Sequence, residues 1–191
     1  DLQTFKLDSR AQQTFWSSLL EEPIHERVLK VSLFAYENAA LPDLLGAWAN
    51  GEREILCAVT AGRHVPQVRA WAGDSLHHGR LTLAFLPFLP QADYDRLLAA
   101  CDLNFVRGED SFVRAQWAGR PFVWHIYQQE EGAHLAKLAA FLDHYTAGLK
   151  AAENAALRDF WRAWEDEEAT AEAWPALLAA LPTLQAHTES W

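Results

Sequence analysis

Apolar residues occur along the chain as short continuous runs that alternate with spaced stripes. The run from Val28 to Tyr36 is nearly unbroken, which is typical of a strand buried on both faces of a sheet. An apolar stripe with helical spacing follows, between Pro42, which suits a first helical turn, and Gly51, which suits a helix end. The pattern predicts a strand followed by a helix.

The same strand–helix unit recurs along the middle of the chain. Further strands are predicted at residues 54–60, 81–85, 103–106 and 121–124, and further helices at 66–72, 91–100, 110–118 and beyond Ala133. Strands that alternate with helices pair in parallel and are joined by crossover helices. We therefore predict an α/β fold, a Rossmann-like parallel sheet with flanking helices, over residues 28–150. Ligands of such sheets lie beyond the carboxyl ends of the strands, so the turns after Phe34, Phe85, Val106 and Trp124 are the places to look for function.

Two segments flank this region. Residues 1–27 are predicted to be a linking segment with one helix, which Asp8 caps and which ends before Pro23. Residues 151–191 are rich in Ala and Leu and predict a helical segment that packs on the domain or on another half of the protein. Pro175 and Pro182 predict breaks within that segment.

Acidic residues at 165–168 are typical of a solvated helix face, and we assign them no function.

Composition narrows the classes of function. The 191 residues hold 16 Lys and Arg against 26 Asp and Glu, a formal net charge of -10, which excludes a broad basic surface for nucleic acid. Apolar runs are interrupted by Pro and are too short to span a membrane.

The start of the chain and its cysteines bear on its origin. The sequence has no Met, opens at Asp1 and shows no secretory signal, so we expect a piece of a longer protein. Cys57 and Cys101 lie in apolar contexts that favour buried thiols in a reducing compartment, and we expect a cytoplasmic location.

The densest polar cluster is the turn from Arg107 to Ser111, between a predicted strand and a predicted helix. Gly108 allows a tight turn, and the helix start offers free N–H groups to an anion. Arg107 adds a positive charge and Ser111 a hydroxyl, which together could hold a diphosphate without a metal. An ordinary helix cap by Asp110 and Ser111, with no ligand, explains the same residues equally well.

Glu109 in this turn argues against simple anion binding. A carboxylate beside a phosphate is unfavourable unless it orients Arg107 or faces a cationic centre such as a developing oxocarbenium ion.

A second candidate site is the loop 85–91. Two prolines stiffen it and would display Phe88 as a platform for a planar base, although core packing of Phe88 is an even alternative. Tyr36, after the first strand, could reach a phosphate or a ribose through its hydroxyl.

Other chemistry is not supported by the sequence. His125, Glu130 and His134 lack the spacing of a metal site, and we expect no metal. His77 and His78 are expected in a solvent-exposed loop. The glycine-rich dinucleotide fingerprint, the Walker sequence and the serine elbow are absent.

Three stretches in order along the chain carry a family resemblance: VSLFAYEN at 31–38, LPFLPQADYDRLL at 86–98, and NFVRGEDSFVRAQWAGRPFVWHIY at 104–127. They resemble the bacterial protein-arginine rhamnosyltransferases that modify elongation factor P. The resemblance implies a GT-B glycosyltransferase of two Rossmann-like domains. This chain is similar to its C-terminal half, which binds TDP-rhamnose as donor substrate.

The resemblance also implies roles for residues. Phe88 would stack on thymine, with Gln91 and Tyr94 near the base and sugar. Glu109 and Arg107 would be catalytic, and the remaining donor contacts would come from Phe34, Tyr36, Gly108, Asp110 and Ser111. The family pattern has Pro after WHIY, where this chain has Gln128.

The general base for the acceptor arginine would belong to the missing N-terminal domain, so the fragment alone is expected to bind donor without transferring. The acceptor would be elongation factor P. The alternative is a non-catalytic nucleotide-sugar or phosphate-binding α/β module.

Overall fold

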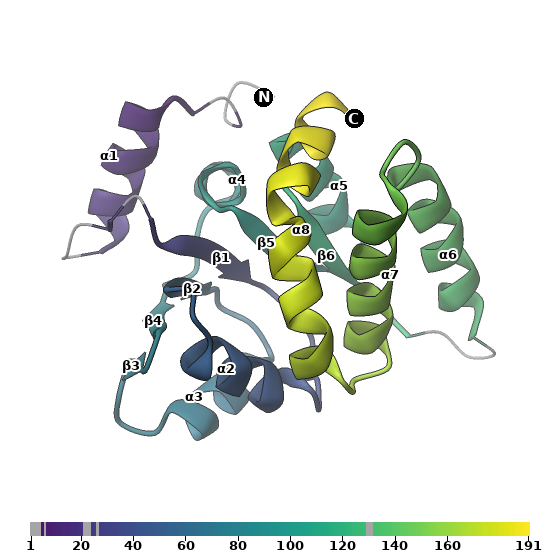
Figure 1. The fold of residues 1–191 in the computed structure, drawn as a ribbon. Coiled ribbons are helices and arrows are strands. Elements are labelled where there is room, and N and C mark those ends of the chain that lie inside the picture. Colours follow the sequence, from purple (N-terminus) through teal and green to yellow (C-terminus); the bar gives the residue numbers. More distant parts are fainter. Residues whose placement is uncertain (1–4, 6, 21–23, 26, 129–131) are drawn as a thin grey trace.

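A computed structural model describes residues 5, 7–20, 24–25, 27–128 and 132–191. Within these residues the chain forms a six-stranded sheet in the order β3-β4-β2-β1-β5-β6 (Figure 1). The strands are β1 Leu29–Leu33, β2 Ile55–Val59, β3 His77–His78, β4 Leu81–Phe85, β5 Leu103–Arg107 and β6 Phe122–His125. All neighbouring strands pair in parallel except β3 and β4. The predicted Rossmann-like α/β fold is confirmed.

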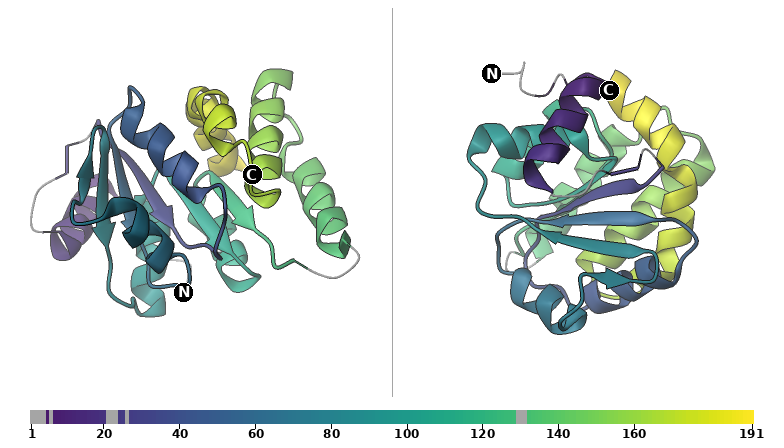
Figure 2. Two further views of the ribbon diagram at one scale, coloured as in Figure 1. Left: turned by 90° about the horizontal axis from the view of Figure 1, so that it is seen from below. Right: turned by 90° about the vertical axis from the view of Figure 1, so that its left-hand side faces the viewer.

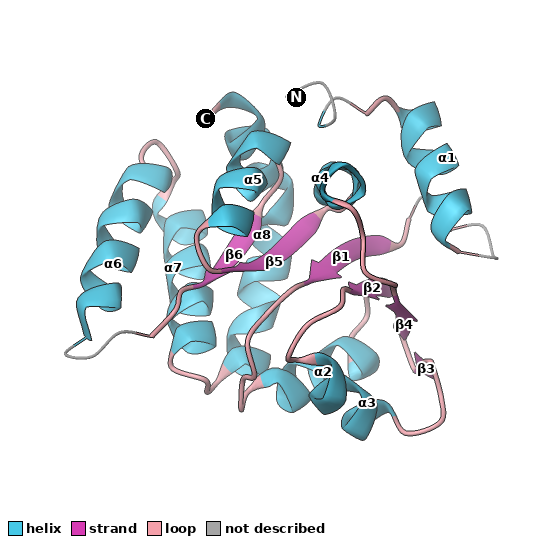
Figure 3. Cartoon of the chain, turned by 180° about the vertical axis from the view of Figure 1, so that it is seen from behind, coloured by secondary structure: helices cyan, strands magenta, loops and turns pink. Residues whose placement is uncertain are grey.

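Helices cover both faces of the sheet (Figure 2). They are α1 Ser9–Leu19, α2 Leu41–Asn50, α3 Val65–Ala72, α4 Gln91–Ala100, α5 Asp110–Ala118, α6 Ala133–Tyr145, α7 Ala151–Glu165 and α8 Thr170–Ser190. Figure 3, seen from behind, shows α4 and α5 on one face, with α1 outside α4, while α2, α7 and α8 lie on the other. The first helix begins as predicted, because Asp8 accepts a hydrogen bond from the Ala11 amide at 2.7 Å.

Two hydrophobic cores result from the alternation of side chains along each strand. In β2, Ile55, Cys57 and Val59 face the core beneath α2, α7 and α8, whereas Leu56 and Ala58 face the core beneath α1 and α4. Both cysteines are buried free thiols. A strand covered on both faces reads as a continuous apolar run, which is why the run was visible in the sequence.

The order in which successive strands are added to the sheet reverses between β1 and β5, which are themselves parallel. From β1 the chain proceeds to β2 and β4 on one side, and from β5 to β6 on the other. A buried polar pair joins the two central strands: the Ser32 hydroxyl donates to Asn104 Oδ1 at 2.6 Å, and Asn104 Nδ2 donates to the Leu98 carbonyl at 2.9 Å. Loops diverge at such a reversal and leave a crevice at the carboxyl ends of the strands.

Three sequence predictions about the fold are wrong. His77 and His78 form a short edge strand paired with β4 rather than a loop, although His77 is exposed. Pro175 and Pro182 lie inside the continuous helix α8, whose buried Trp174 and Leu177 anchor it to the core.

The third concerns the acidic stretch. Glu165 is only 3% exposed, and Glu167 accepts a hydrogen bond from the Ala39 amide at 2.9 Å, so the stretch is not a uniformly solvated face. Sequence spacing could not show that α7 places its C-terminal end against the loops after β1 and β6.

Candidate functional site

A cleft of ≈ 470 Å³ lies at the carboxyl edge of the sheet, where the loops after β1 and β5 diverge. Each site residue predicted from the sequence lines it: Phe34, Tyr36, Phe88, Gln91, Tyr94, Arg107, Gly108, Glu109, Asp110 and Ser111. Four further residues line the cleft and were not predicted from the sequence: Thr60, Ala61, Leu89 and Arg114. The structure therefore brings together residues that are up to 80 positions apart (Phe34 to Arg114).

The turn between β5 and α5 is held in place by the neighbouring strand β6. The Gly108 amide donates to the His125 carbonyl at 3.2 Å, and the Gly108 carbonyl accepts from Trp124 Nε1 at 2.7 Å. Gly108 has φ of +61°, and a Cβ there would lie 3.2 Å from Tyr36 Oη. Both the conformation and the close approach of Tyr36 require glycine at this position.

The start of α5 opens into the cleft without a side-chain cap. Glu109 occupies the N-cap position, its side chain caps nothing, and the first intrahelical bond runs from the Val113 amide to the Glu109 carbonyl at 3.1 Å. Asp110 and Ser111 therefore lie within the first turn and are not the cap. The amides of this first turn have no partner within the helix and remain available to an anion.

Ser111 stabilises the turn itself. Its hydroxyl donates to the Arg107 carbonyl and accepts from the Arg107 amide at 3.0 Å. In this arrangement the hydroxyl proton is already used, so Ser111 offers a ligand a lone pair or its backbone amide. Ser111 therefore shapes the turn in addition to lining the cleft.

Arg107 is one of two arginines that line the cleft. Its guanidinium carbon lies 4.4 Å from the ring centre of Phe34 and 4.8 Å from that of Tyr36, distances typical of cation–π contacts. Among the described residues no carboxylate forms an ion pair with Arg107, and exposed Glu109 beside it forms none either. Two aromatic faces thus hold a positive charge that a bound anion can neutralise.

The opposite end of the cleft is aromatic. Phe88 is 85% exposed, which excludes core packing, the alternative left open by the sequence. Tyr94 packs edge-on against Phe34, with ring centres 5.8 Å apart. Burial raises the pKa of the Tyr94 hydroxyl, so this group stays neutral and can form hydrogen bonds.

Arg114 is the charged residue among the four cleft residues that were not predicted from the sequence. It forms ion pairs with Asp110, four residues earlier on α5, and with Asp95 on α4, at 3.1 Å and 2.8 Å. The spacing of Asp110 and Arg114 was a usable signal for the first pair. The second depends on how α4 packs beside α5, which the sequence alone does not give.

A smaller hollow of ≈ 220 Å³ adjoins the cleft across Tyr36, and His125 and Tyr127 line it. The Tyr36 ring lies edge-on to His125 at 5.1 Å and to Tyr127 at 5.9 Å. Burial, with a contribution from Arg107, lowers the pKa of His125 to about 4, so its imidazole is neutral at pH 7. Glu130, considered with His125 and His134 as a metal ligand, lies outside the described residues.

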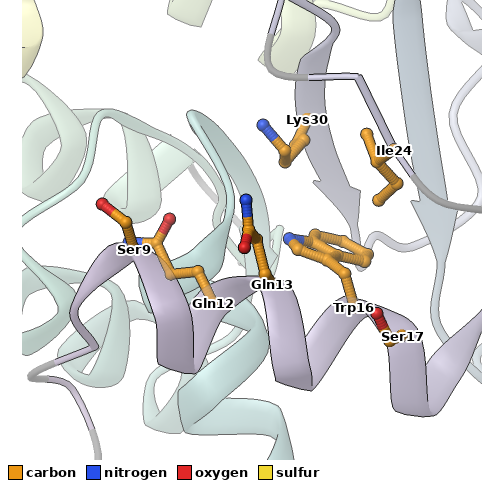
Figure 4. Close-up of a pocket in the computed structure, with 7 residues that line it drawn as sticks. All are labelled: Ser9, Gln12, Gln13, Trp16, Ser17, Ile24 and Lys30. Carbon is orange, nitrogen blue, oxygen red and sulfur yellow. The ribbon is translucent and has the colours of Figure 1, made fainter.

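Another hollow, of ≈ 580 Å³, lies at the amino edge of the sheet, away from the cleft (Figure 4). Side chains of α1, among them Gln13 and Trp16, line it together with Lys30 at the start of β1. Lys30 Nζ lies 4.0 Å from Asp102 and donates to the Val28 carbonyl at 3.4 Å. This cation is already satisfied, and the hollow lacks the open helix end that the cleft has.

The described residues contain no group of three or more His, Cys, Asp and Glu side chains able to hold a metal ion. They also include no helix with the length and apolar character needed to cross a bilayer.

A mostly parallel sheet with helices on both faces and a cleft at its point of reversal defines a class, the Rossmann-like α/β domains. Within that class, the family model described as "Elongation-Factor P (EF-P) rhamnosyltransferase EarP" matches residues 2–191. The chain belongs to the EarP family, which confirms the resemblance seen in the sequence.

Individual relatives agree with this assignment. The chain is 48% identical over 197 residues to a protein-arginine rhamnosyltransferase of Pseudomonas aeruginosa and 44% identical over 194 residues to that of Pseudomonas putida, in each case over 98% of this chain and 51% of the relative. A solved structure that describes EarP-mediated arginine glycosylation of translation elongation factor EF-P matches with a TM-score of 0.87 and 41% identity, over 100% of this chain and 62% of that chain. The chain spans about half the length of the curated relatives it matches.

Proposed function

We propose that this chain is the donor-binding half of an inverting glycosyltransferase that transfers rhamnose from TDP-rhamnose to an arginine of elongation factor P in the cytoplasm. The observation that carries the proposal is the cleft, where Arg107 without a carboxylate partner and the open start of α5 face the same space as exposed Phe88. The family match over residues 2–191 supports it.

In this proposal each end of the cleft binds one part of the donor. The thymine ring stacks on Phe88, and the diphosphate lies against the α5 amides and Arg107, with no metal between them. Tyr36, next to Gly108, lies where its hydroxyl can donate to the diphosphate. The two ends together explain why an acidic chain can bind an anionic nucleotide.

The transfer step follows from this placement. A guanidine nitrogen of the acceptor forms a bond to C1 of rhamnose from the face opposite the diphosphate, while the C1–O bond breaks and its electron pair goes to the diphosphate. Arg107 and the α5 amides stabilise the charge that develops on the leaving group. Exposed Glu109, at the N-cap, faces the cationic sugar or the acceptor. The acceptor's proton leaves to a base outside these residues.

Replacement of Glu109 tests the catalytic part of the proposal in the protein that contains both halves. We expect Glu109→Ala to lower rhamnosylation by about 100-fold, a typical loss for an electrostatic transition-state contact, while TDP affinity stays within about threefold. Mass spectrometry of elongation factor P incubated with TDP-rhamnose measures the transfer, and calorimetry measures the affinity.

Glu52→Ala is the matched control, because Glu52 is also an exposed carboxylate but lies before β2, at the amino edge. Wild-type transfer by Glu109→Ala would remove Glu109 from the mechanism. Absence of any TDP or TDP-rhamnose binding to the wild-type chain would reject the donor site as a whole. Donor binding without transfer by the two-half protein would favour the non-catalytic module instead.

A further inference from the structure

The turn after α7 has a glutamate where the backbone favours glycine. The Glu168 amide donates to the Ala163 carbonyl at 3.0 Å, which is the hydrogen bond that closes a Schellman motif at a helix end. The residue before it, Glu167, has a φ of +58°. A Cβ is unfavourable in this left-handed conformation, so glycine is the residue most often found there. A glutamate at this position therefore needs a contact of its side chain to explain it.

The contact of the Glu167 side chain is with the loop after β1. Its Oε2 accepts a hydrogen bond from the Ala39 amide at 2.9 Å, although the two residues lie 128 positions apart in the chain. A glycine would relax the turn but would remove this acceptor from the Ala39 amide. Glu167 therefore connects the end of α7 to the loop after β1.

A second contact at the same place holds the buried side of this loop. Asn38, which is 1% exposed, donates from Nδ2 to the Trp164 carbonyl in the last turn of α7 at 2.8 Å. Glu167 holds the outer side of the loop, and it lines the same hollow of ≈ 220 Å³ as Tyr36. The loop after β1 is thus attached to the end of α7 at two neighbouring residues.

Tyr36 is the residue of this loop that reaches the donor cleft. Its ring centre lies 4.8 Å from the guanidinium carbon of Arg107 and 5.1 Å from the ring centre of His125, and its hydroxyl lies beside Gly108. Edge-on ring contacts occur over a range of separations, so they do not by themselves fix the hydroxyl. The place of the hydroxyl depends on the backbone that carries the ring.

We propose that Glu167 is a positioning residue for donor binding. Its hydrogen bond to the Ala39 amide fixes the loop after β1, so that the Tyr36 hydroxyl is directed at the diphosphate, and the unfavourable backbone of Glu167 serves this end. The inference rests on the proposed function, in which Tyr36 donates to the diphosphate. It adds a residue that lines the neighbouring hollow and acts on the donor only through Tyr36.

Two substitutions of Glu167, made in the protein that contains both halves, separate the side chain from the backbone. Glu167→Gly removes the acceptor, so we expect TDP to bind about fivefold more weakly by calorimetry, as for part of one hydrogen bond. Its melting temperature without nucleotide should stay within about 2 °C of wild type, because the relaxed backbone offsets the lost hydrogen bond. Glu167→Gln keeps an acceptor oxygen and should bind TDP within about twofold of wild type.

Ala169→Gly is the matched control in the same turn. Ala169 also has a positive φ, of +54°, but its methyl group cannot accept a hydrogen bond. We expect this variant to raise the melting temperature by about 2 °C and to leave TDP affinity unchanged.

A double-mutant cycle with Tyr36→Phe distinguishes positioning from a general structural role. Tyr36→Phe keeps the ring and removes the hydroxyl, so we expect weaker TDP binding. Glu167→Gly should then cause no further loss in the Tyr36→Phe background, because the group that it positions is already absent. A residue that only stabilises the fold would lower the affinity by the same factor in both backgrounds.

Wild-type TDP affinity in Glu167→Gly, or an equal factor of loss with and without the Tyr36 hydroxyl, would overturn the inference and leave the donor site standing. A loss in Glu167→Gln as large as that in Glu167→Gly would overturn it as well, since the glutamine retains the acceptor. Failure of the wild type to bind TDP would overturn the proposed function and the inference together.

Discussion

Two groups of polar residues lie at the same edge of the sheet, and they differ in their exposure to solvent. The cleft turn, Arg107–Ser111, follows β5 and is open to solvent at Glu109 and Asp110. The buried cluster consists of His125 at the end of β6 and of His134 and Glu165 on the helices α6 and α7 behind it, and His134 Nε2 is 3.9 Å from Glu165 Oε1. In the first group polar atoms remain free for a ligand. In the second they are enclosed by the protein.

Protonation shows the consequence of this difference. In the buried cluster, burial raises the pKa of Glu165 to about 7, with smaller contributions from Asp166 and Glu167, and burial lowers the pKa of His125 to about 4. Both shifts favour the neutral form, as expected where charge is poorly solvated. The buried cluster therefore affects stability, whereas the cleft turn is expected to affect binding. Substitutions in the two regions should separate these properties.

The largest expected effect is on stability, behind β6. Trp161 on α7 is fully buried and its Nε1 donates to the Phe122 carbonyl at 3.0 Å. Trp161→Ala leaves a cavity and an unpaired carbonyl, so we expect the free energy of unfolding to fall by about 3–5 kcal/mol in urea titrations. Trp117→Ala, at a tryptophan that is 52% exposed, should cost about 1 kcal/mol or less. Equal losses in the two variants would contradict this division between core and surface.

A pH-dependent effect is expected next, at Glu165. Its pKa in the folded chain, about 7, lies above the usual glutamate pKa of 4.5, so the folded state binds the proton more tightly. The resulting stabilisation is present at low pH and is lost as pH rises from about 4.5 through about 7. Glu165→Gln removes this loss. We expect the free energy of unfolding of the variant, compared with that of the wild type, to be roughly 2 kcal/mol higher at pH 8 than at pH 5.

His125 changes stability in the opposite direction. Its folded pKa of about 4 lies below the usual histidine pKa of 6.5, so the unfolded chain binds more protons and stability rises between about pH 4 and 6.5. Glu165→Gln should therefore reveal a steeper rise of stability with pH over this window. Urea titrations from pH 4 to 8 measure both effects, and parallel profiles for variant and wild type would show that Glu165 does not titrate near 7.

The smallest expected effect is in the open cleft, at Phe88. Since its ring is 85% exposed, Phe88→Ala should change the free energy of unfolding by no more than about 0.5 kcal/mol. Loss of a base-stacking face should weaken TDP about tenfold, or roughly 1.4 kcal/mol, by calorimetry. Leu76→Ala, at an exposed apolar residue beside β3, is the control and should leave affinity unchanged. A large loss of stability in Phe88→Ala would place Phe88 with the core residues.

The Rossmann-like fold was predictable because each strand is covered on both faces and each helix on one, which leaves continuous runs and spaced stripes in the sequence. The cleft was largely predictable as well, because Gly108 and the polar residues beside it lie in one strand-to-helix turn. The partners of that turn were not predictable from spacing. Trp124 and His125, which hold Gly108, belong to a strand whose position beside β5 depends on the sheet order.

The sequence by itself determined the order of strands and helices, the turn with a glycine at positive φ and the family to which the chain belongs. Only the tertiary structure decided that Glu165 is buried, that Pro175 and Pro182 remain within α8, and that Arg114 connects α4 to α5. Local conformation follows from neighbours in the chain. Burial and charge pairing depend on which elements pack together, and this is why polar residues are open to solvent after β5 and buried behind β6.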